Sequence, residues 1–327
     1  MTALLEVEDL HVEFRTRDGV AHVLNGVTYH VQAGETLAVL GESGSGKSVT
    51  AQAVMGILDT PPAFVTGGSV RFRGEELLTA TPQRRREVRA EGIAMIFQDA
   101  LSALNPVFTV GFQIEEQLRL RRGMSRRDAR KRAVELLDLV RIPHAAQRVR
   151  DYPHQFSGGM RQRAMIAMSL ALDPEVLIAD EPTTALDVTV QAQIMDLLAE
   201  LQRERRMALV LITHDLGVVA EVADRIAVMY AGRIVEHSDA LSLFRAPGHP
   251  YTEALLRSLP HLESKGTKLE TIKGLPPSLL RIPPGCPFHP RCPRAEQVCS
   301  LEVPPQVPLG SGRTSACHFA LEVVGRG

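Results

Sequence analysis

The stretch with the clearest chemical meaning is residues 41–48, whose sequence is Gly-Glu-Ser-Gly-Ser-Gly-Lys-Ser. This is the pattern G-x-x-x-x-G-K-S of a phosphate-binding loop (P-loop), in which glycines allow a tight turn that points backbone N–H groups at phosphate oxygens. Lys47 can reach the β- and γ-phosphates of a nucleotide, and the Ser48 hydroxyl can ligate Mg²⁺. An apolar run at residues 36–40 precedes the loop, and a proline-free run at residues 49–58 follows it. Because the motif requires a strand before the loop and a helix after it, these flanks favour a P-loop over a glycine-rich turn that binds nothing.

Two acidic residues form the next candidate site. Residues 176–179 are Val-Leu-Ile-Ala, and Asp180 and Glu181 follow them directly. Buried strands of open α/β folds present such side chains at the carboxyl edge of the sheet, where ligands bind. We expect Asp180 to help hold Mg²⁺, through water, and Glu181 to polarise the attacking water. Two acids after a strand are a weak signal alone, but together with a P-loop they are a strong one.

Gln98 and His214 also follow predicted strands, at residues 93–97 and 207–212. A single histidine is more often structural, but at this edge of the sheet His214 is a candidate sensor of the γ-phosphate. The side-chain carbonyl oxygen of Gln98 can reach a metal ion or the attacking water.

A serine and two glycines, Ser157, Gly158 and Gly159, open a proline-free run at residues 160–172. They leave backbone N–H groups uncovered at a helix N-terminus, which is a second anion site. If this turn and the P-loop lie on different subdomains, one ATP cannot contact both in the same chain. The sequence therefore predicts a head-to-tail dimer, in which ATP lies between the P-loop of one chain and the serine-glycine turn of the other.

The composition is that of an ordinary globular protein. The chain has 327 residues, with 44% hydrophobic residues, 23% charged residues and a formal net charge of −1. This charge gives no overall attraction to nucleic acid or to a membrane surface, and we interpret the basic residues at 119–132 as a solvated helix face. No apolar run approaches the ~18 residues of a membrane span, and the N-terminus lacks the basic region of a signal peptide. We therefore expect a cytosolic protein, whose cysteines are free, catalytic or metal-bound.

Hydrophobic patterning divides the chain into three regions. Residues 4–40 alternate apolar and polar positions, as half-buried strands do. Residues 99–170 have a helical character, with a capping box at residues 125–128. Apolar strands then alternate with a helix, which indicates a mostly parallel sheet covered by helices, with 99–170 inserted as a helical subdomain.

The composition changes again after about residue 245. Thirteen prolines lie between residues 247 and 308, and three of the four cysteines lie in the same stretch. This predicts a separate, loop-rich module that does not continue the sheet.

In their order and spacing, these motifs resemble those of the ATP-binding cassette (ABC) transporter ATPases, over residues 4 to about 237. The resemblance implies an α/β P-loop fold with a RecA-like core, an antiparallel β subdomain and the inserted helical subdomain. It also gives the family's motifs their places in this chain: Walker A at 41–48, the Q-loop at Gln98, the signature at 156–160, Walker B at 176–181, the D-loop at 185–187 and the switch histidine at His214. The signature usually reads Leu-Ser-Gly-Gly-Gln, and here Phe156 and Met160 replace its first and last residues.

The same resemblance implies the site residues. Glu181, His214 and Gln98 are the expected catalytic residues, and Ser48, Gln98 and Asp180 are the expected Mg²⁺ ligands. The residues expected to contact ATP are Phe14, Gly41, Ser43, Gly44, Gly46, Lys47, Ser48, Val49, Ser157, Gly158, Gly159 and Asp187. Phe14 is placed like the aromatic that stacks on adenine, although a lone aromatic in a strand is equally a core residue.

The C-terminal part resembles one branch of the family. Residues 229–236, His249-Pro250-Tyr251-Thr252 and the cysteine-containing segments are similar to those of the oligopeptide and dipeptide importers, in particular their D-type ATPase subunit. This implies an ABC nucleotide-binding domain at residues 1–245 and a C-terminal extension at residues 246–327.

The branch also implies a function and partners. The chain would be the ATP-hydrolysing subunit of a di- or oligopeptide importer, peripheral to the cytoplasmic face of the inner membrane. Its partners would be a second, homologous ATPase subunit, two transmembrane permease subunits and an extracytoplasmic peptide-binding protein, with no nucleic acid. Nickel or haem-type cargo is an alternative. A soluble ABC ATPase acting on DNA or ribosomes is a weaker one, because the chain has one cassette and only a compact insert.

The four cysteines, Cys286, Cys292, Cys299 and Cys317, have the spacing C-x5-C-x6-C-x17-C. Zinc sites usually contain shorter C-x2–4-C spacings, and four thiolates can also hold an iron–sulfur cluster. Similar permease subunits have this pattern with a [4Fe–4S] cluster, so the resemblance implies a cluster that orders the extension, far from the ATP edge of the sheet. Zinc, with His289 and His318 as substitute ligands, and four reduced thiols are the alternatives.

Overall fold

A computed structural model of the protein describes residues 3–184, 186–258 and 272–325. The chain divides into two compact units. The first comprises residues 1–4, 31–35 and 79–212, and the second comprises residues 5–30, 36–78 and 213–327. Among the described residues no helix combines the length and the apolar character that crossing a membrane requires.

The first unit contains a parallel sheet in which β7 (Val176–Asp180) lies between β6 (Ile93–Ile96) and β8 (Ala208–Thr213). The helix α8 (Val188–Arg205) forms the connection from β7 to β8. Every residue of β7 and β8 is buried, which is why both strands are apolar up to their last residues, Asp180 and Thr213. The prediction of parallel strands alternating with a helix is therefore confirmed here.

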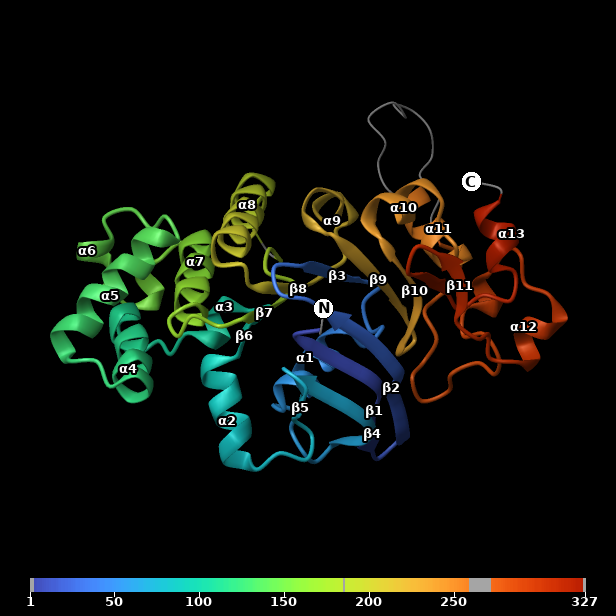
Figure 1. Ribbon diagram of the computed structural model, residues 1–327, viewed down its shortest axis with the longest axis horizontal. Coiled ribbons are helices and arrows are strands. Elements are labelled where there is room, and N and C mark those ends of the chain that lie inside the picture. The colour runs from blue at the N-terminus through green and yellow to red at the C-terminus, as the bar shows by residue number, and fades with distance from the viewer. Residues whose placement is uncertain (1–2, 185, 259–271, 326–327) are drawn as a thin grey trace. The chain divides into compact units, whose positions relative to one another are not determined.

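The rest of the first unit is helical, as predicted for residues 99–170. Its helices are α2 (Pro82–Glu91), α3 (Ala100–Ala103), α4 (Val110–Arg122), α5 (Arg126–Leu139), α6 (Ala145–Arg148), the short η1 (Pro153–Gln155) and α7 (Gly158–Ser169). The predicted start of α5 is confirmed, because the Ser125 hydroxyl accepts a hydrogen bond of 3.1 Å from the Asp128 backbone N–H. In Figure 1 the helices α4 to α7 form one green group, and α5 buries its Ala129, Ala133, Leu136 and Leu137.

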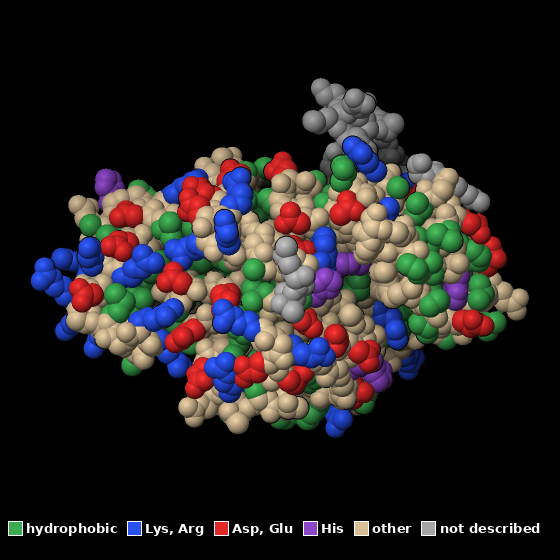
Figure 2. All heavy atoms as spheres, viewed as in Figure 1, with side chains coloured by type: hydrophobic (Ala, Val, Ile, Leu, Met, Phe, Trp, Pro, Cys, Tyr) green, Lys and Arg blue, Asp and Glu red, His purple; other side chains and the backbone are tan. Residues whose placement is uncertain are grey.

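The basic residues of α4 and α5 lie on the surface among acidic ones. Arg130 pairs with Glu115 at 2.8 Å, and Arg132 pairs with Glu135 at 3.3 Å. Figure 2 shows blue and red side chains interleaved over these helices. The charges are thus arranged as on a solvated helix face.

The second unit contains an antiparallel sheet of β2 (Gly19–Val31), β1 (Leu5–Thr16), β4 (Ala63–Phe72) and β5 (Glu75–Glu76), in that order. The predicted alternation is present, since Leu5, Val7, Leu10 and Val12 are buried on β1. A register shift between Glu8 and His11, with Asp9 at φ 45°, explains why the spacing changes from two to three in the middle of this strand.

The strand before the P-loop belongs to another set of paired strands in this unit, which are part of an eight-stranded sheet. β3 (Thr36–Leu40) runs parallel to β9 (Arg225–Tyr230), β9 pairs antiparallel with β10 (Arg233–Asp239), and β10 pairs with β12 (Arg313–Ser315), which pairs with β11 (Val307–Gly310). The expectation that the segment after residue 245 does not continue the sheet is therefore wrong. β10 would otherwise present unpaired backbone groups at its outer edge, and β12 supplies their partners, with Ser315 opposite Glu236. The division of the chain near residue 245 stays a prediction.

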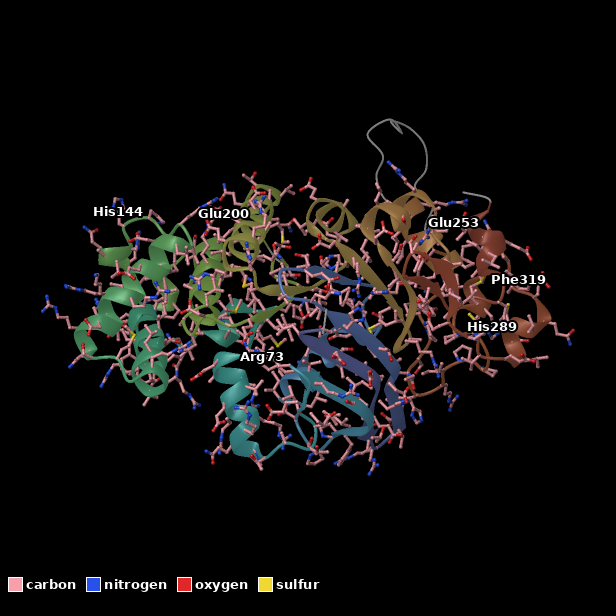
Figure 3. The ribbon with its side chains drawn as sticks, in the orientation of Figure 1. Arg73, His144, Glu200, Glu253, His289 and Phe319 are labelled. Carbon is pink, nitrogen blue, oxygen red and sulfur yellow. The ribbon has the colours of Figure 1, made fainter. Side chains whose placement is uncertain are left out.

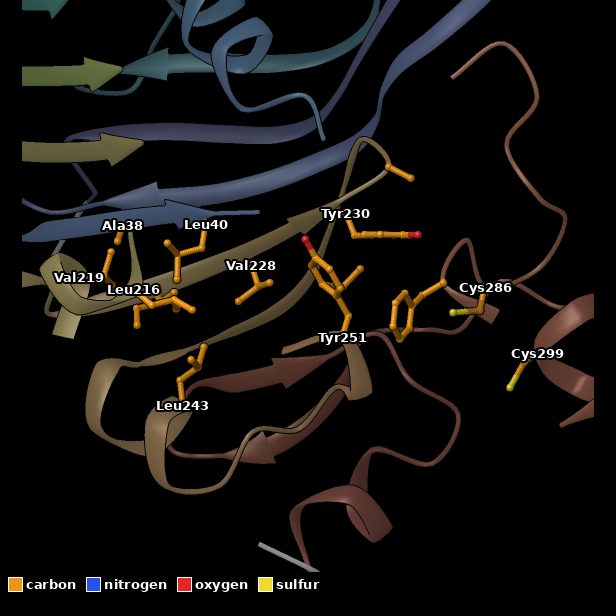
Figure 4. Packing of buried hydrophobic residues seen from close by; sticks show 14 residues of the cluster. Ala38, Leu40, Leu216, Val219, Val228, Tyr230, Leu243, Tyr251, Cys286 and Cys299 are labelled. Atoms are coloured by element: carbon orange, nitrogen blue, oxygen red, sulfur yellow. The ribbon is translucent and has the colours of Figure 1, made fainter. Parts of the chain in front are cut away.

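Helices cover this sheet and extend into the C-terminal segment. They are α1 (Lys47–Met55), α9 (Leu216–Val222), α10 (Ala240–Arg245), α11 (Pro250–Arg257), η2 (His289–Arg291), α12 (Gln297–Leu301) and α13 (Ala320–Val324). One hydrophobic core connects the sheet to the C-terminal segment. Figure 4 shows it from Ala38 and Leu40 of β3, through Tyr230 and Tyr251, to Cys286.

Candidate functional site: the P-loop and the motifs around it

The P-loop follows β3 directly, and α1 begins inside it at Lys47. The Lys47 side chain is buried, and its ammonium donates hydrogen bonds to the carbonyl oxygens of Gly41 at 2.8 Å and Glu42 at 3.0 Å. The loop therefore holds the positive charge of Lys47 among its own backbone groups. This is the strand–loop–helix context that the sequence predicted.

Two glycines of the loop are required by its geometry. Gly41 has φ 159°, and a Cβ there would lie 2.2 Å from the carbonyl oxygen of Met229 on β9. Gly46 has φ 108°, and a Cβ there would lie 2.8 Å from the Met229 side chain. Only glycine fits at either position, because the backbone is both strained for other residues and pressed against β9.

The loop also fits a phosphate ligand chemically. The Ser45 hydroxyl is buried and has no hydrogen-bond partner among the residues that the structure describes. A buried hydroxyl without a partner is costly, and a phosphate oxygen is a suitable acceptor for it. Ser43 and Gly44 are exposed and form the open side of the loop, while Ser48 and Val49 are half-buried.

His214 belongs to the same unit as the P-loop and follows β8. It is exposed, and the next residue, Asp215, caps α9 by accepting a hydrogen bond of 2.9 Å from the Gly217 N–H. The histidine is thus placed directly between a buried strand and a capped helix, on a short and well-anchored connection.

The first unit brings two of the predicted catalytic residues into contact. Gln98 donates a hydrogen bond of 3.2 Å from its side-chain amide to Glu181 Oε2, and the Thr184 hydroxyl donates one of 2.8 Å to the same oxygen. Glu181 has φ 46°, and its backbone N–H donates to the Ile212 carbonyl at 2.8 Å. A left-handed backbone is unfavourable for glutamate, so the contacts at the end of β7 must stabilise this strained conformation of Glu181. Thr184 has no signal in the sequence that would have selected it.

The serine-glycine turn begins α7, as predicted. The Ser157 hydroxyl accepts a hydrogen bond of 3.3 Å from the Met160 N–H, and Phe156 is buried beneath the turn. Gly158 is exposed, so the N-terminal N–H groups of α7 are open to a ligand. A Cβ at Gly159 would lie 2.8 Å from Val190 of α8, which explains the glycine there.

The positions of two further residues predicted to contact ATP, Asp187 and Phe14, give no direct indication of that role. Asp187 caps α8, accepting a hydrogen bond of 3.0 Å from the Val190 N–H, and the predicted D-loop residue Ala185 lies outside the described residues. Phe14 is half-buried on β1, opposite Ala63 of β4. A role for Phe14 in stacking on adenine stays a prediction.

All four cysteines line one cavity in the C-terminal part of the second unit. His289, Phe319 and His318 line the same cavity, and Figure 3 shows sulfur atoms near His289 and Phe319. The backbone N–H of Cys286 donates to the Cys299 carbonyl at 2.8 Å, and the N–H of Arg294 donates to the Cys292 sulfur at 3.4 Å. The cysteines are thus gathered in space although 31 positions separate the first from the last.

Three of the four thiols are shielded from water. Cys286, Cys299 and Cys317 are buried, and none of the four is in a disulfide. Burial raises the pKa of Cys286 and of Cys317 to about 11 in each case. A metal or cluster that binds here must displace these protons, so its uptake becomes easier as the pH rises.

Sequence reasoning missed one contact of the P-loop. Arg291, between two of the cysteines, forms an ion pair with Glu42, the second residue of the loop. The two residues are 249 positions apart, and neither belongs to a motif position with an assigned role. The segment that contains the cysteines thus reaches the P-loop through Arg291, while the expected distance of a cluster from the ATP edge of the sheet stays a prediction.

The comparisons with known proteins agree with this geometry. A family model described as ABC transporter matches residues 24–184, and one described as the C-terminal region of oligopeptide/dipeptide transporters matches residues 235–299. The oligopeptide transport ATP-binding protein OppD of Salmonella typhimurium is 52% identical over 98% of this chain and 94% of its own length. The dipeptide transport ATP-binding protein DppD of Bacillus subtilis is 49% identical over 97% of this chain and 95% of its own.

Solved structures of other ATP-binding cassettes have a similar fold. The dimeric ATP-binding cassette MJ0796, in a post-hydrolysis state with ADP and Pi, has a TM-score of 0.65 and 27% identity, over 72% of this chain and 98% of its own. The protein cbiO1 of Clostridium perfringens, part of an ABC transporter complex, has a TM-score of 0.64 and 29% identity, over 75% of this chain and 91% of its own.

The fold and its motifs therefore define an ABC-type ATPase cassette. Within that class, the chain belongs to the family of ATP-binding subunits of oligopeptide and dipeptide transporters.

The contact between Gln98 and Glu181 leads to the first prediction. Glu181→Gln should keep ATP binding, because the P-loop is unchanged, but lower steady-state ATP hydrolysis by about 10²–10⁴-fold, since a positioned base is lost. The measurement is ATPase turnover of the purified transporter complex, together with ATP affinity. Glu175→Gln is the matched control, because Glu175 precedes the other end of β7 and should leave turnover unchanged. Wild-type turnover in Glu181→Gln would remove Glu181 from the role of base.

Proposed function

We propose that this chain is the ATP-hydrolysing motor subunit of an importer for dipeptides or oligopeptides. The proposal rests on the hydrogen bond between the Gln98 amide and the Glu181 carboxylate. It rests also on the similarity of this chain to peptide-transport ATP-binding proteins over almost their whole length. A chain of this family is a peripheral subunit at the cytoplasmic face of the inner membrane, where ATP hydrolysis drives a permease.

The residues of the motifs divide the work of hydrolysis. The backbone of residues 41–46 and the Lys47 ammonium bind the phosphates, with Ser45 as an additional donor. Ser48 of the second unit, and Asp180 and Gln98 of the first, each carry an oxygen that suits Mg²⁺, which when bound would neutralise charge on the phosphates. Glu181 holds and deprotonates the attacking water, and His214 senses the γ-phosphate. Gln98 keeps Glu181 oriented until ATP and Mg²⁺ are present.

The exposed N-terminus of α7 is the contribution of this chain to a partner's ATP. Ser157, Gly158 and Gly159 offer a hydroxyl and free N–H groups on the surface of the first unit, as a site for the γ-phosphate of nucleotide on another cassette. The dimeric form of the related cassette MJ0796 supports such an arrangement. In this importer the partner is a second, homologous ATPase subunit.

Exposed apolar side chains at Phe97, beside Gln98 in the chain, and around the start of α4 are the docking surface for the permease. Phe97, Val107, Phe108 and Phe112 are all exposed, and the rings of Phe108 and Phe112 stack with centroids 4.9 Å apart. Exposed aromatic groups of this kind are typical of protein interfaces. Because Phe97 is adjacent to Gln98, a permease bound here can respond to the state of the ATP site, and an extracytoplasmic binding protein delivers the peptide to that permease.

The four-cysteine cavity is the site of a [4Fe–4S] cluster. In the described part of the chain, no group of three or more His, Cys, Asp or Glu is placed so that it could hold a metal ion. The support for a cluster is therefore the shared cavity of the four cysteines. A cluster of several irons spans a wider set of thiolates, and four cysteines lining one cavity match its needs. When bound, the cluster joins the loop before η2, helix α12 and the segment before α13, which stabilises a segment rich in proline.

The position of Ser157 leads to the second prediction. Ser157→Arg should abolish ATP hydrolysis by the assembled importer but leave the ATP affinity of the isolated subunit unchanged, because the serine contacts the partner's nucleotide. The measurements are turnover of the complex and equilibrium binding to the single subunit. Ser125→Arg is the matched control, since it also removes a helix cap, worth about 1 kcal/mol, in the same unit. Loss of ATP affinity in the isolated Ser157→Arg subunit would contradict the trans arrangement.

The cysteine cavity leads to the third prediction. Anaerobically purified protein should contain iron and inorganic sulfide and absorb near 400 nm, an approximate figure for iron–sulfur chromophores. Replacing any one of the four cysteines by serine should remove this absorbance and lower stability. His289→Gln and His318→Gln should keep it, because the ligands are all thiolates. A colourless protein with one zinc per chain, or without metal, would contradict the cluster.

A further inference from the structure

The side chain of Glu42 is held by the C-terminal segment. Arg291 Nη1 lies 2.5 Å from Glu42 Oε2, and Arg291 Nη2 lies 3.0 Å from Glu42 Oε1. Both carboxylate oxygens are therefore bound by one guanidinium, in the two-point geometry that gives arginine its directional strength. The Arg291 side chain is only 6% exposed and that of Glu42 is 25% exposed, so solvent screens this pair weakly.

The backbone of Glu42 is held by a second residue from the same segment. The Glu42 N–H donates a hydrogen bond of 2.9 Å to the hydroxyl oxygen of Tyr251, which is buried in α11. Side chain and main chain at the second position of the P-loop are thus both fixed by residues that follow residue 245.

Arg291 is itself held in a dense environment. Its Nε donates a hydrogen bond of 3.0 Å to the Lys273 carbonyl, and its guanidinium carbon lies 5.9 Å from the ring centre of Tyr230 and 6.0 Å from that of Phe288. The rings of Tyr230, Tyr251 and Phe288 pack with centroids 4.6–5.3 Å apart. Figure 4 shows Tyr230 and Tyr251 side by side, with Cys286 beyond them. Arg291 is therefore fixed in one direction, toward Glu42.

The contact between Arg291 and Glu42 affects nucleotide binding because Glu42 is negatively charged. ATP places several negative charges in the P-loop, and Glu42 is a carboxylate within that loop. A carboxylate free to turn toward the phosphates would repel them, and the repulsion would be strong in a partly buried site. The ion pair neutralises the carboxylate and holds both of its oxygens on Arg291.

We propose that Arg291 is a positioning residue for the P-loop, which acts through Glu42 and makes ATP affinity depend on the order of the four-cysteine segment. Arg291 ends the short helix η2 and Cys292 follows it directly, while Phe288 lies between Cys286 and Arg291. Whatever orders the cysteines therefore orders the loop that presents the guanidinium. The proposal rests on the proposed function only in that the P-loop binds ATP.

The fourth prediction tests the positioning role with the full-length subunit and ATP, by equilibrium binding. Arg291→Gln should raise the Kd for ATP about tenfold, because Glu42 becomes an uncompensated negative charge. The double variant Glu42→Gln with Arg291→Gln should recover most of this affinity, since no charge remains to repel phosphate. Arg291→Lys should lie between wild type and Arg291→Gln, because it keeps the charge but loses the two-point contact.

Arg294→Gln is the matched control. Arg294 lies three positions further along, and its partner is Glu253 of α11, at 3.0 Å, rather than a P-loop residue. This variant should keep the wild-type Kd, and the thermal unfolding midpoints of both variants report whether the fold is intact.

The outcomes separate this proposal from the proposed function. A wild-type Kd in Arg291→Gln, or a double variant as weak as Arg291→Gln, would overturn the positioning role while ATP binding stands. A wild-type subunit that binds no ATP would instead overturn the proposed function. If Arg291→Gln fails to fold, Arg291→Lys is compared with Arg294→Gln instead. A raised Kd for ATP in Arg291→Lys alone would support the positioning role, and an unchanged Kd in both variants would overturn it.

The link to the cysteines has its own test in the same measurement. Cys292→Ser should raise the Kd for ATP, and in the Arg291→Gln background it should add little further, because both changes act through the same contact. Equal, additive losses, or no loss in Cys292→Ser alone, would overturn the dependence on the cysteine segment.

Discussion

The close packing of the P-loop backbone against β9 is the constraint on which the nucleotide-binding loop depends. At Gly41 there is no room for a side-chain atom, because the Met229 carbonyl would lie 2.2 Å from it. The turn after β9 adds a hydrogen bond of 2.9 Å from the Gly232 N–H to the Ser45 carbonyl. A loop fixed so tightly keeps its N–H groups and Lys47 preorganised for phosphate, so little conformational freedom is lost when the ligand binds.

The first unit applies the same principle to the acid pair. Glu181 has an unfavourable backbone conformation, which the hydrogen bond to Ile212 and the burial of β7 maintain. Gln98 and Thr184 then fix one carboxylate oxygen. Gln98 is thereby joined to Glu181, the proposed catalytic acid, while the neighbouring Phe97 is exposed. A short polar contact thus connects the proposed chemistry to a surface suited to a partner, without a long chain of intervening groups.

The C-terminal segment belongs to the same compact unit as the P-loop. Its strand β12 extends the sheet from β10, its Tyr251 and Phe288 complete the core behind β9, and its Arg291 neutralises a P-loop carboxylate. A segment with many prolines buries little apolar surface by itself, so it depends on the sheet for order. The dependence also acts in the opposite direction, because the P-loop residue Glu42 has its partners in this segment.

The sequence by itself determined the features that are local. The P-loop, the acids at the end of β7 and the helix starts at Ser125 and Ser157 are short patterns, whose conformations follow from glycine, capping side chains and apolar runs within a few residues. Only the tertiary structure decided the contact of Arg291 with Glu42, the pairing of β12 with β10 and the gathering of four cysteines around one cavity. Arg291 and Glu42 are ordinary charged residues that elsewhere on a surface would be solvated, and β12 is only three residues long. Their partners are far away in the chain, so what selects them is the packing of the whole unit, which leaves no local pattern in the sequence.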